Sequence, residues 1–248
     1  MKFKLIFTLL VSAVASIANA QRPVPDHEKT KGGELTIQPI NHATMVLTYQ
    51  HKNIYVDPVG GAEAFKGEPA PDMILITDIH GDHLDPKTID AVNTKHAILV
   101  VPQAVADKLP NADKSKLVVL KNGESTTKFD IGITAIPMYN LPESPTAFHT
   151  KGRGNGYVLT FGGKKVYISG DTADIPEMRA LTGIDIAFVC MNLPYTMDVK
   201  TAASGVLAFK PKVVYPYHYR GQDTGEFKKL VNAGDKNIDV RLRDWYAK

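Results

Sequence analysis

The sequence predicts an α/β protein with the architecture of an αββα four-layer sandwich. Two observations support this fold: short strand patterns dominate, and each half of the chain runs from antiparallel strands into alternating strands and helices. With 248 residues, of which 44% are hydrophobic and 22% charged, the chain is long enough to bury the core of such a fold.

The first half begins as an antiparallel meander. Strand patterns at 35–39, 45–49 and 53–56 follow one another closely, and the apolar run at 73–76 is typical of a strand covered on both faces. That run ends abruptly in the polar stretch Thr77 to His83. The next elements alternate like βαβ units: a helix beginning at Pro86, a strand at 97–101, a helix at 103–109 and a strand at 117–120.

The second half repeats this order without a detectable residue-level repeat. Its antiparallel part is predicted to contain strands at 125–129, 131–136, 157–161 and 165–168, the last two joined by a Gly162-Gly163 turn. Helices then alternate with strands, the helices at 175–181, 201–209 and 225–231 and the strands at 184–189, 213–217 and 238–242. The doubled order predicts two sheets packed face to face, with helices on both outer sides.

The first 20 residues differ from the rest of the chain. Lys2 and Lys4 precede an uncharged apolar run, Leu5 to Ile17, which is shorter than the roughly 20 residues that span a bilayer. Ala18-Asn19-Ala20 supplies small residues of the kind that signal peptidase accepts. We therefore expect residues 1–20 to be a cleaved secretory signal and the mature protein to be periplasmic or secreted.

Residues 21–33 are polar, contain two prolines and show no apolar period, which predicts a mobile leader before a single domain at 34–248. The signal contributes two of the 29 basic residues, so the remainder carries 27 basic against 26 acidic residues. No basic stripe with interleaved aromatic residues occurs, so we expect no nucleic-acid partner. The single cysteine, Cys190, follows an apolar run and is expected to be a buried strand residue.

The loop after the apolar run at 73–76 is the strongest chemical signal. It contains Asp78, His80, Asp82 and His83 within six positions, and a rigid strand end can hold such side chains together. Imidazole and carboxylate groups bind divalent ions such as zinc. A solvated charged turn would explain one His and one Asp but does not readily explain this set.

Two further segments follow the same logic. Asp171 follows the strand predicted to end at Ile168, and His218 closes the strand at 213–217. A metal site assembled from several strand ends accounts for all three segments. The remaining histidines are less informative: His27, His51 and His96 are expected to be solvated or structural.

With these residues the chain resembles the metallo-β-lactamase superfamily, whose hallmark is a strand followed by His-x-His-x-Asp-His, with later His, Asp and His ligands. The resemblance extends from the Asn-His-Ala-Thr stretch at 41–44 through Asp57, the loop at 78–83 and Gly170-Asp171-Thr172 to His218. It is greatest to the branch that includes ascorbate-6-phosphate lactonase and the phospholipase D acting on N-acyl phosphatidylethanolamine. The resemblance implies a hydrolase with one or two metal ions.

The sequence departs from this pattern at two positions, because Asp78 and Asn140 stand where the family has histidines. The resemblance implies one complete four-ligand site, formed by Asp82, His83, Asp171 and His218. A second site keeps only His80 and the bridging Asp171. Asp78 can supply an oxygen ligand there, and Asn140 or His149 can fill the remaining place. We expect zinc, with manganese or iron as alternatives because the second site has more carboxylate and less imidazole.

A divalent ion would lower the pKa of its bound water toward about 7 and so supply hydroxide at neutral pH. We expect Asp82 to ligate the metal and shuttle protons, and Asp78 to orient water if it does not bind metal. Asp57 is expected either to accept a hydrogen bond from a ligand imidazole or to cap a turn.

Candidate substrate contacts lie beside these loops. The glycine-rich stretch 149–156 carries Lys151 and Arg153, which predicts either a site for a phosphate or carboxylate or a flexible surface hairpin. Other candidates near the site are Tyr139, Tyr195, Tyr217, Tyr219, Arg220 and His42, the last without being a ligand.

The sequence therefore predicts an exported metal-dependent hydrolase of an ester, lactone or phosphodiester bond in a small molecule, with an anionic molecule as one candidate substrate. β-Lactam hydrolysis is disfavoured because the fold supports many hydrolyses. The main alternative is a metal- or ligand-binding protein without turnover, and work on lipids at a membrane surface is a third. The oligomeric state stays open.

Overall fold

The computed structural model describes residues 22–94 and 97–247. Within them, the first sheet has the strand order β1 to β7. Its strands are β1 (Asp26–Thr30), β2 (Gly33–Asn41), β3 (Thr44–Tyr49), β4 (Lys52–Val56), β5 (Met73–Leu75), β6 (Ile98–Val101) and β7 (Leu117–Val119). Strands β1 to β4 pair antiparallel, whereas β4 to β7 pair parallel. The predicted meander followed by β-α alternation is confirmed.

The second sheet repeats this organisation, with the order β14 to β8. Its strands are β8 (Ser125–Lys128), β9 (Ile131–Met138), β10 (Gly154–Phe161), β11 (Lys164–Ile168), β12 (Ile186–Cys190), β13 (Val213–Tyr217) and β14 (Asp239–Val240). Strands β8 to β11 pair antiparallel and β11 to β14 pair parallel. The doubled order predicted from the sequence is therefore correct.

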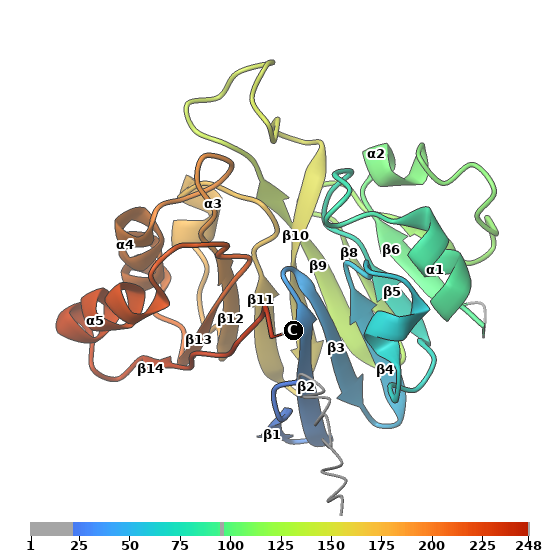
Figure 1. The fold of residues 1–248 in the computed structure, drawn as a ribbon, viewed down its shortest axis with the longest axis horizontal. Coiled ribbons are helices and arrows are strands. Elements are labelled where there is room, and N and C mark those ends of the chain that lie inside the picture. The colour runs from blue at the N-terminus through green and yellow to red at the C-terminus, as the bar shows by residue number, and fades with distance from the viewer. Residues whose placement is uncertain (1–21, 95–96, 248) are drawn as a thin grey trace, which may run out of the picture.

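Helices cover the outer face of each sheet (Figure 1). On the first sheet they are the 3-10 helix η1 (Ala62–Phe65), α1 (Pro86–Val92) and α2 (Gln103–Ala106). On the second sheet they are α3 (Pro176–Arg179), α4 (Val199–Phe209) and α5 (Thr224–Gly234). Strand β3 shows why both faces are apolar: Met45 and Leu47 lie in the core between the sheets, whereas Val46 packs under the helices. This is the predicted αββα sandwich.

One part of the sequence expected to be a mobile leader is instead a strand. Residues 26–30 form β1, which pairs with β2 in regular register. Two of the three half-buried positions of β1 are acidic: Glu28 accepts hydrogen bonds from Lys164 and Arg241, each at 2.6 Å, and Asp26 pairs with Arg243. A pattern of alternating apolar residues cannot reveal this strand, because its acidic side chains form ion pairs with distant residues instead of packing in the hydrophobic core.

Other N-terminal expectations lie outside the described residues, which exclude the proposed signal at 1–20. In the part of the chain that the structure describes, no helix combines the length and apolar character needed to cross a membrane. Cys190 is buried, as expected, at the end of β12. His51 is exposed in a turn, and His96 lies outside the described residues.

Candidate metal centre

Each candidate ligand follows a strand of one of the two sheets. The loop after β5 contains a tight turn, in which the backbone N–H groups of His83 and Leu84 both donate to the carbonyl of His80. Asp85 then caps α1 by accepting from the N–H of Lys87 at 3.0 Å. Carboxyl ends of parallel strands gather at one edge of a sheet. The loop after β5 lies at such an edge of the first sheet and the loops after β11 and β13 at one of the second, and side chains from all three meet.

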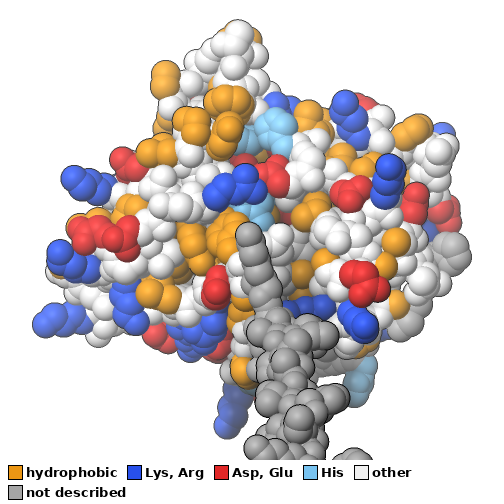
Figure 2. Space-filling model, in the orientation of Figure 1, with side chains coloured by type: hydrophobic (Ala, Val, Ile, Leu, Met, Phe, Trp, Pro, Cys, Tyr) orange, Lys and Arg blue, Asp and Glu red, His pale blue; other side chains and the backbone are white. Residues whose placement is uncertain are grey.

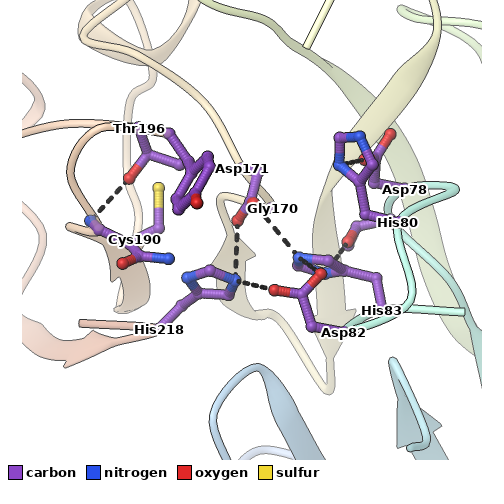
Figure 3. Close-up of polar contacts among 12 residues, drawn as sticks. Asp78, His80, Asp82, His83, Gly170, Asp171, Cys190, Thr196 and His218 are labelled. Carbon is purple, nitrogen blue, oxygen red and sulfur yellow. Dashed lines mark hydrogen bonds and ion pairs between the residues drawn. The ribbon is translucent and has the colours of Figure 1, made fainter. Parts of the chain in front are cut away.

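The first cluster consists of His83, Asp171 and His218, and Asp82 adjoins it (Figure 3). The Nε2 atoms of His83 and His218 each lie 3.3 Å from a carboxylate oxygen of Asp171. His218 Nε2 also lies 3.4 Å from Asp82 Oδ2. The four side chains that the sequence assigned to one complete metal site are thus brought together.

The second cluster consists of Asp78, His80 and His149. Asp78 Oδ2 lies 2.7 Å from His80 Nδ1 and 3.8 Å from His149 Nε2. His149 Nε2 is also 3.2 Å from Asp171 Oδ2. Asp171 therefore lies between the two clusters, in the position of a bridging ligand.

The chemistry of these side chains fits divalent ions. His83 Nε2, His149 Nε2, His218 Nε2 and Asp171 Oδ1 are all buried and have no hydrogen-bond partner. Burying such atoms unpaired costs free energy, and native proteins rarely do so. All four belong to the two clusters, and a cation accepting their lone pairs would satisfy them.

Asp57 fixes the orientation of His83. Its carboxylate accepts from His83 Nδ1 at 2.8 Å and from the backbone N–H and hydroxyl of Thr77, both at 2.7 Å. With the proton on Nδ1, the Nε2 lone pair of His83 points into the first cluster. Of the two roles expected for Asp57, the geometry matches the positioning of an imidazole.

Asn140 does the same for His149. Its Oδ1 accepts from the His149 backbone N–H at 2.8 Å and lies 3.1 Å from His149 Nδ1, while its Nδ2 donates to the carbonyl of Tyr195 at 2.8 Å. Both ends of the Asn140 amide are thus used within the protein. Of the two candidates for the open place in the second cluster, His149 is the one aimed at it.

The backbone around the clusters is tightly constrained. Gly170 has φ of +59°, and a Cβ there would lie 2.4 Å from Met138 Sδ, so only glycine fits before Asp171. His42, Asp57 and His218 adopt left-handed φ values of 45° to 56°. Such backbone costs about 1 to 2 kcal/mol per non-glycine residue and is typical of functional sites.

The carboxylates of the first cluster are ionised. Burial raises the pKa of Asp171, but the nearby imidazoles of His218 and His83 outweigh it and hold that pKa well below the ordinary value. Burial likewise raises the pKa of Asp82, and contacts with His218 and His42 lower it further than burial raises it. Ionised carboxylates are the form that binds metal.

Burial lowers the pKa of His83, but the carboxylates of Asp171 and Asp57 on either side raise it well above the ordinary value. The cluster therefore attracts positive charge strongly. This is the electrostatic environment expected where a divalent cation binds.

His42 lies beside the first cluster, as expected, and reveals a residue that the sequence analysis missed. His42 Nε2 is 3.1 Å from Asp82 Oδ2, and His42 Nδ1 is 2.5 Å from the hydroxyl of Tyr246. The centroids of the His42 and His218 rings lie 3.8 Å apart, with the ring planes tilted by 35°. Tyr246 follows the last strand, and no motif spacing connects it to the rest of the site.

The two basic residues expected to bind an anionic substrate are paired within the protein. Arg153 donates to both oxygens of Asp78, at 3.3 and 3.2 Å. Lys151 donates to Glu143 at 3.0 Å and lies 3.6 Å from Glu177. Their positive charge is therefore largely compensated by carboxylates. Arg220 is exposed, and its backbone N–H donates to Tyr246.

The expected tyrosines divide into buried and accessible groups. Tyr139 and Tyr217 are buried, and the Tyr217 hydroxyl accepts from the N–H of Gly170 at 3.0 Å. Tyr219 is half-buried, whereas Tyr195 is 43% exposed. Only Tyr195 among these side chains is both large and substantially open to solvent.

Comparisons with known proteins identify the family of the chain. Residues 36–218 match the family described as the Beta-lactamase superfamily domain. The chain is 31% identical over 205 residues to a UPF0173 metal-dependent hydrolase of Thermococcus onnurineus, covering 77% of this chain and 89% of the relative. It is 30% identical over 217 residues to one from Thermococcus kodakarensis, covering 82% and 94%.

Solved structures of similar proteins have the same fold. A protein from Parabacteroides distasonis, proposed to be a metal-dependent hydrolase, is 45% identical with a TM-score of 0.81, covering 89% of this chain and 98% of that one. A metallo hydrolase from Ignicoccus hospitalis has the same fold at 22% identity, with a TM-score of 0.71 and coverage of 84% and 94%. The chain belongs to the UPF0173 family of metal-dependent hydrolases, within the metallo-β-lactamase superfamily.

Proposed function

We propose that the protein is an exported hydrolase that uses one or two divalent ions to cleave an ester, lactone or phosphodiester bond in a small molecule. The convergence of His83, Asp171 and His218, with buried ligand atoms that lack partners, carries this proposal. The proposed export rests on the charge and apolar pattern of residues 1–20.

Bound divalent ions supply an activated water and polarise the bond under attack. Asp82 is the accessible carboxylate of the site, with 41% of its side chain exposed, and its lowered pKa keeps it ionised at neutral pH. Because Asp82 accepts from His42 Nε2, the hydroxyl of Tyr246 donates to His42 Nδ1. This chain of contacts holds Asp82 where it can accept a proton from water and return it to the leaving group.

Zinc is the first candidate for the metal, and manganese or iron are alternatives. Both clusters contain nitrogen and oxygen donors, which zinc accepts. Asp171 lies between the clusters and could bridge two ions. We therefore propose two metal positions, with Asp82, His83, Asp171 and His218 at one and Asp78, His80, His149 and Asp171 at the other.

The similarity to the branch with ascorbate-6-phosphate lactonase and the N-acyl phosphatidylethanolamine phospholipase D supports ester, lactone and phosphodiester substrates over β-lactams. It rests on the Asn-His-Ala-Thr stretch at 41–44 and on the order of the motifs. The pairing of Lys151 and Arg153 with carboxylates gives little support to a strongly anionic substrate.

The test is hydrolysis of a panel of esters, lactones, phosphodiesters and a β-lactam by zinc-, manganese- and iron-loaded protein. We expect turnover of at least one of the first three classes, inhibition by a chelator and recovery when the metal is returned. His83→Ala should lose this activity, whereas His51→Ala, in an exposed turn, should retain it. Tight metal binding without metal-dependent turnover of any substrate would identify a binding protein instead.

A further inference from the structure

Exposed large hydrophobic side chains gather at one place on the molecule. Within residues 22–94 and 97–247, five such side chains are exposed, and four of them belong to the loops that connect β9 to β10 and β12 to α4. These four, named here the apolar rim, are Leu141 (46% exposed), Phe148 (51%), Leu193 (49%) and Tyr195 (43%). Figure 2 shows hydrophobic side chains gathered beside histidine at the upper part of the face in view.

The apolar rim is joined directly to the metal centre. Phe148 immediately precedes His149, whose Nε2 faces the second cluster. Asn140 links the two loops, since it holds His149 through Oδ1 and donates to the carbonyl of Tyr195 through Nδ2. The Phe148 and Tyr195 rings meet edge to face, with centroids 4.9 Å apart.

Packing within the protein does not account for these exposed side chains. The backbone of the loop is fixed, because Arg153 donates to the carbonyl of Phe148 and Asn140 ties the loop to Tyr195, yet the side chains remain near half exposed. Exposed apolar groups gathered in one patch are typical of a ligand-binding surface. Aromatic side chains have only two rotatable bonds, so they lose little conformational entropy when they bind a ligand.

The charges around the rim favour an apolar ligand. Lys151 and Arg153 lie on the same loop, but Glu143 pairs with the first and Asp78 with the second. The rim therefore presents hydrocarbon rather than free positive charge next to the second cluster. An aliphatic chain extending from the reacting carbonyl group would cover it.

We propose that the apolar rim is the binding surface for the aliphatic acyl chain of an ester or lactone substrate. This inference rests on the proposed hydrolase function and narrows its substrate class. Water adds to the acyl carbon, the bond between that carbon and the alkoxy oxygen breaks, and the alkoxy oxygen takes up a proton. An ester gives an alcohol and a carboxylic acid that retains the aliphatic chain, whereas a lactone gives one hydroxy acid that retains it.

The kinetic test uses 4-nitrophenyl acetate, butyrate and octanoate with zinc-loaded protein. We expect kcat/KM to rise by about two- to fourfold per methylene over the first few added, as expected for burial of hydrocarbon on a half-open surface. In the double variant Phe148→Ser/Tyr195→Ser, the octanoate-to-acetate ratio should fall toward one. Val24→Ser, which removes the exposed hydrophobic residue outside the rim, should keep the wild-type ratio.

A binding test separates failure of the rim from failure of the hydrolase proposal. Calorimetry with zinc-loaded protein compares octanoate with acetate, which share the carboxylate that can contact metal. We expect octanoate to bind at least tenfold more tightly, and the double variant to lose this preference even if no ester is hydrolysed. The metal-to-protein ratio of the variant reports whether its site is intact.

Three results would overturn the inference. The first is equal binding of octanoate and acetate by wild-type protein. The second is an unchanged preference in the double variant. The third is rim-dependent binding to phosphatidylcholine vesicles without any octanoate preference, which would assign the rim to a membrane surface instead.

Discussion

Asp57→Asn should weaken metal binding although Asp57 is not itself a proposed ligand. The Asp57 side chain is fully buried, and both of its oxygens accept hydrogen bonds, one from the Thr77 N–H and one shared by the Thr77 hydroxyl and His83 Nδ1. An amide replaces one acceptor by an NH2 donor. That donor must face either the Thr77 N–H or His83, so one contact becomes repulsive or His83 changes tautomer.

The size of the effect follows from these contacts. If His83 moves its proton to Nε2, the lone pair aimed at the first cluster is lost. Loss of such an outer hydrogen bond typically reduces metal affinity about 10- to 100-fold, or about 1.4 to 2.7 kcal/mol. Leaving the buried Thr77 donor unpaired would cost the fold about 1 to 3 kcal/mol as well.

The assay is competition for zinc against a chromophoric chelator, with thermal unfolding of the metal-free protein measured separately. Asp72→Asn is the matched control, since Asp72 accepts from the Asn53 N–H at 3.0 Å and from Lys52 at 3.2 Å, away from the clusters. Asp57→Asn protein that folds and binds zinc within twofold of wild type would refute the proposed role of Asp57.

Three further results are expected. His83→Ala should lose most of the tightly bound zinc measured by elemental analysis, whereas His51→Ala should retain it; equal zinc content would contradict the assignment of the first cluster. Burial raises the pKa of Glu28, but Lys164 and Arg241 lower it below the ordinary value, so its ion pairs stabilise the fold at neutral pH and the stabilisation disappears as pH falls through that lowered pKa. Glu28→Gln should therefore cost about 1 kcal/mol at pH 7, about 2 to 4 °C in Tm, and the difference from wild type should disappear as pH falls through the lowered pKa of Glu28; a constant difference at all pH values would show that packing rather than charge is lost. Burial raises the pKa of the Cys190 thiol to about 12, so a thiol reagent should label it only after unfolding; rapid labelling of the native protein would contradict its burial.

Much of the fold could be predicted because its strands carry local patterns. Runs such as Ile186–Cys190 and Val213–Tyr217 are apolar throughout, since both of their faces are covered, and they pair in parallel as such runs do. Strand β1 gave no such signal, because Asp26 and Glu28 occupy two of its three half-buried positions. Their arginine partners, Arg241 and Arg243, lie more than 200 residues away in the chain.

The candidate site could be predicted as far as strand ends define it. The loop from Asp78 to His83, Asp171 and His218 all follow strands, and the packing of the two sheets against each other brings these strand ends together. Whether Asn140 or His149 faces the second cluster depends on the path of the long loop between β9 and β10, which the sequence alone does not define. Tyr246 and the pairing of Arg153 with Asp78 depend on contacts between segments far apart in sequence, which no spacing encodes.

The pairing of Arg153 with Asp78 changes the interpretation of the second cluster. Burial raises the pKa of Asp78, but His80, His83 and Arg153 lower it further, so the carboxylate is ionised. Asp78 brings a negative charge and an oxygen donor to the position where the superfamily pattern has a neutral imidazole. In this chain the positive charge of Arg153 lies beside it and compensates that negative charge.

The two clusters then offer the same kinds of donor. The first has two carboxylates and two imidazoles in Asp82, Asp171, His83 and His218, and the second has the same in Asp78, Asp171, His80 and His149. A preference for harder ions would therefore apply to both rather than to the second alone. The difference between them is electrostatic: Arg153 stands beside only the second cluster, and its charge repels a cation there. Of two ions, the one at the first cluster should therefore bind first and more tightly.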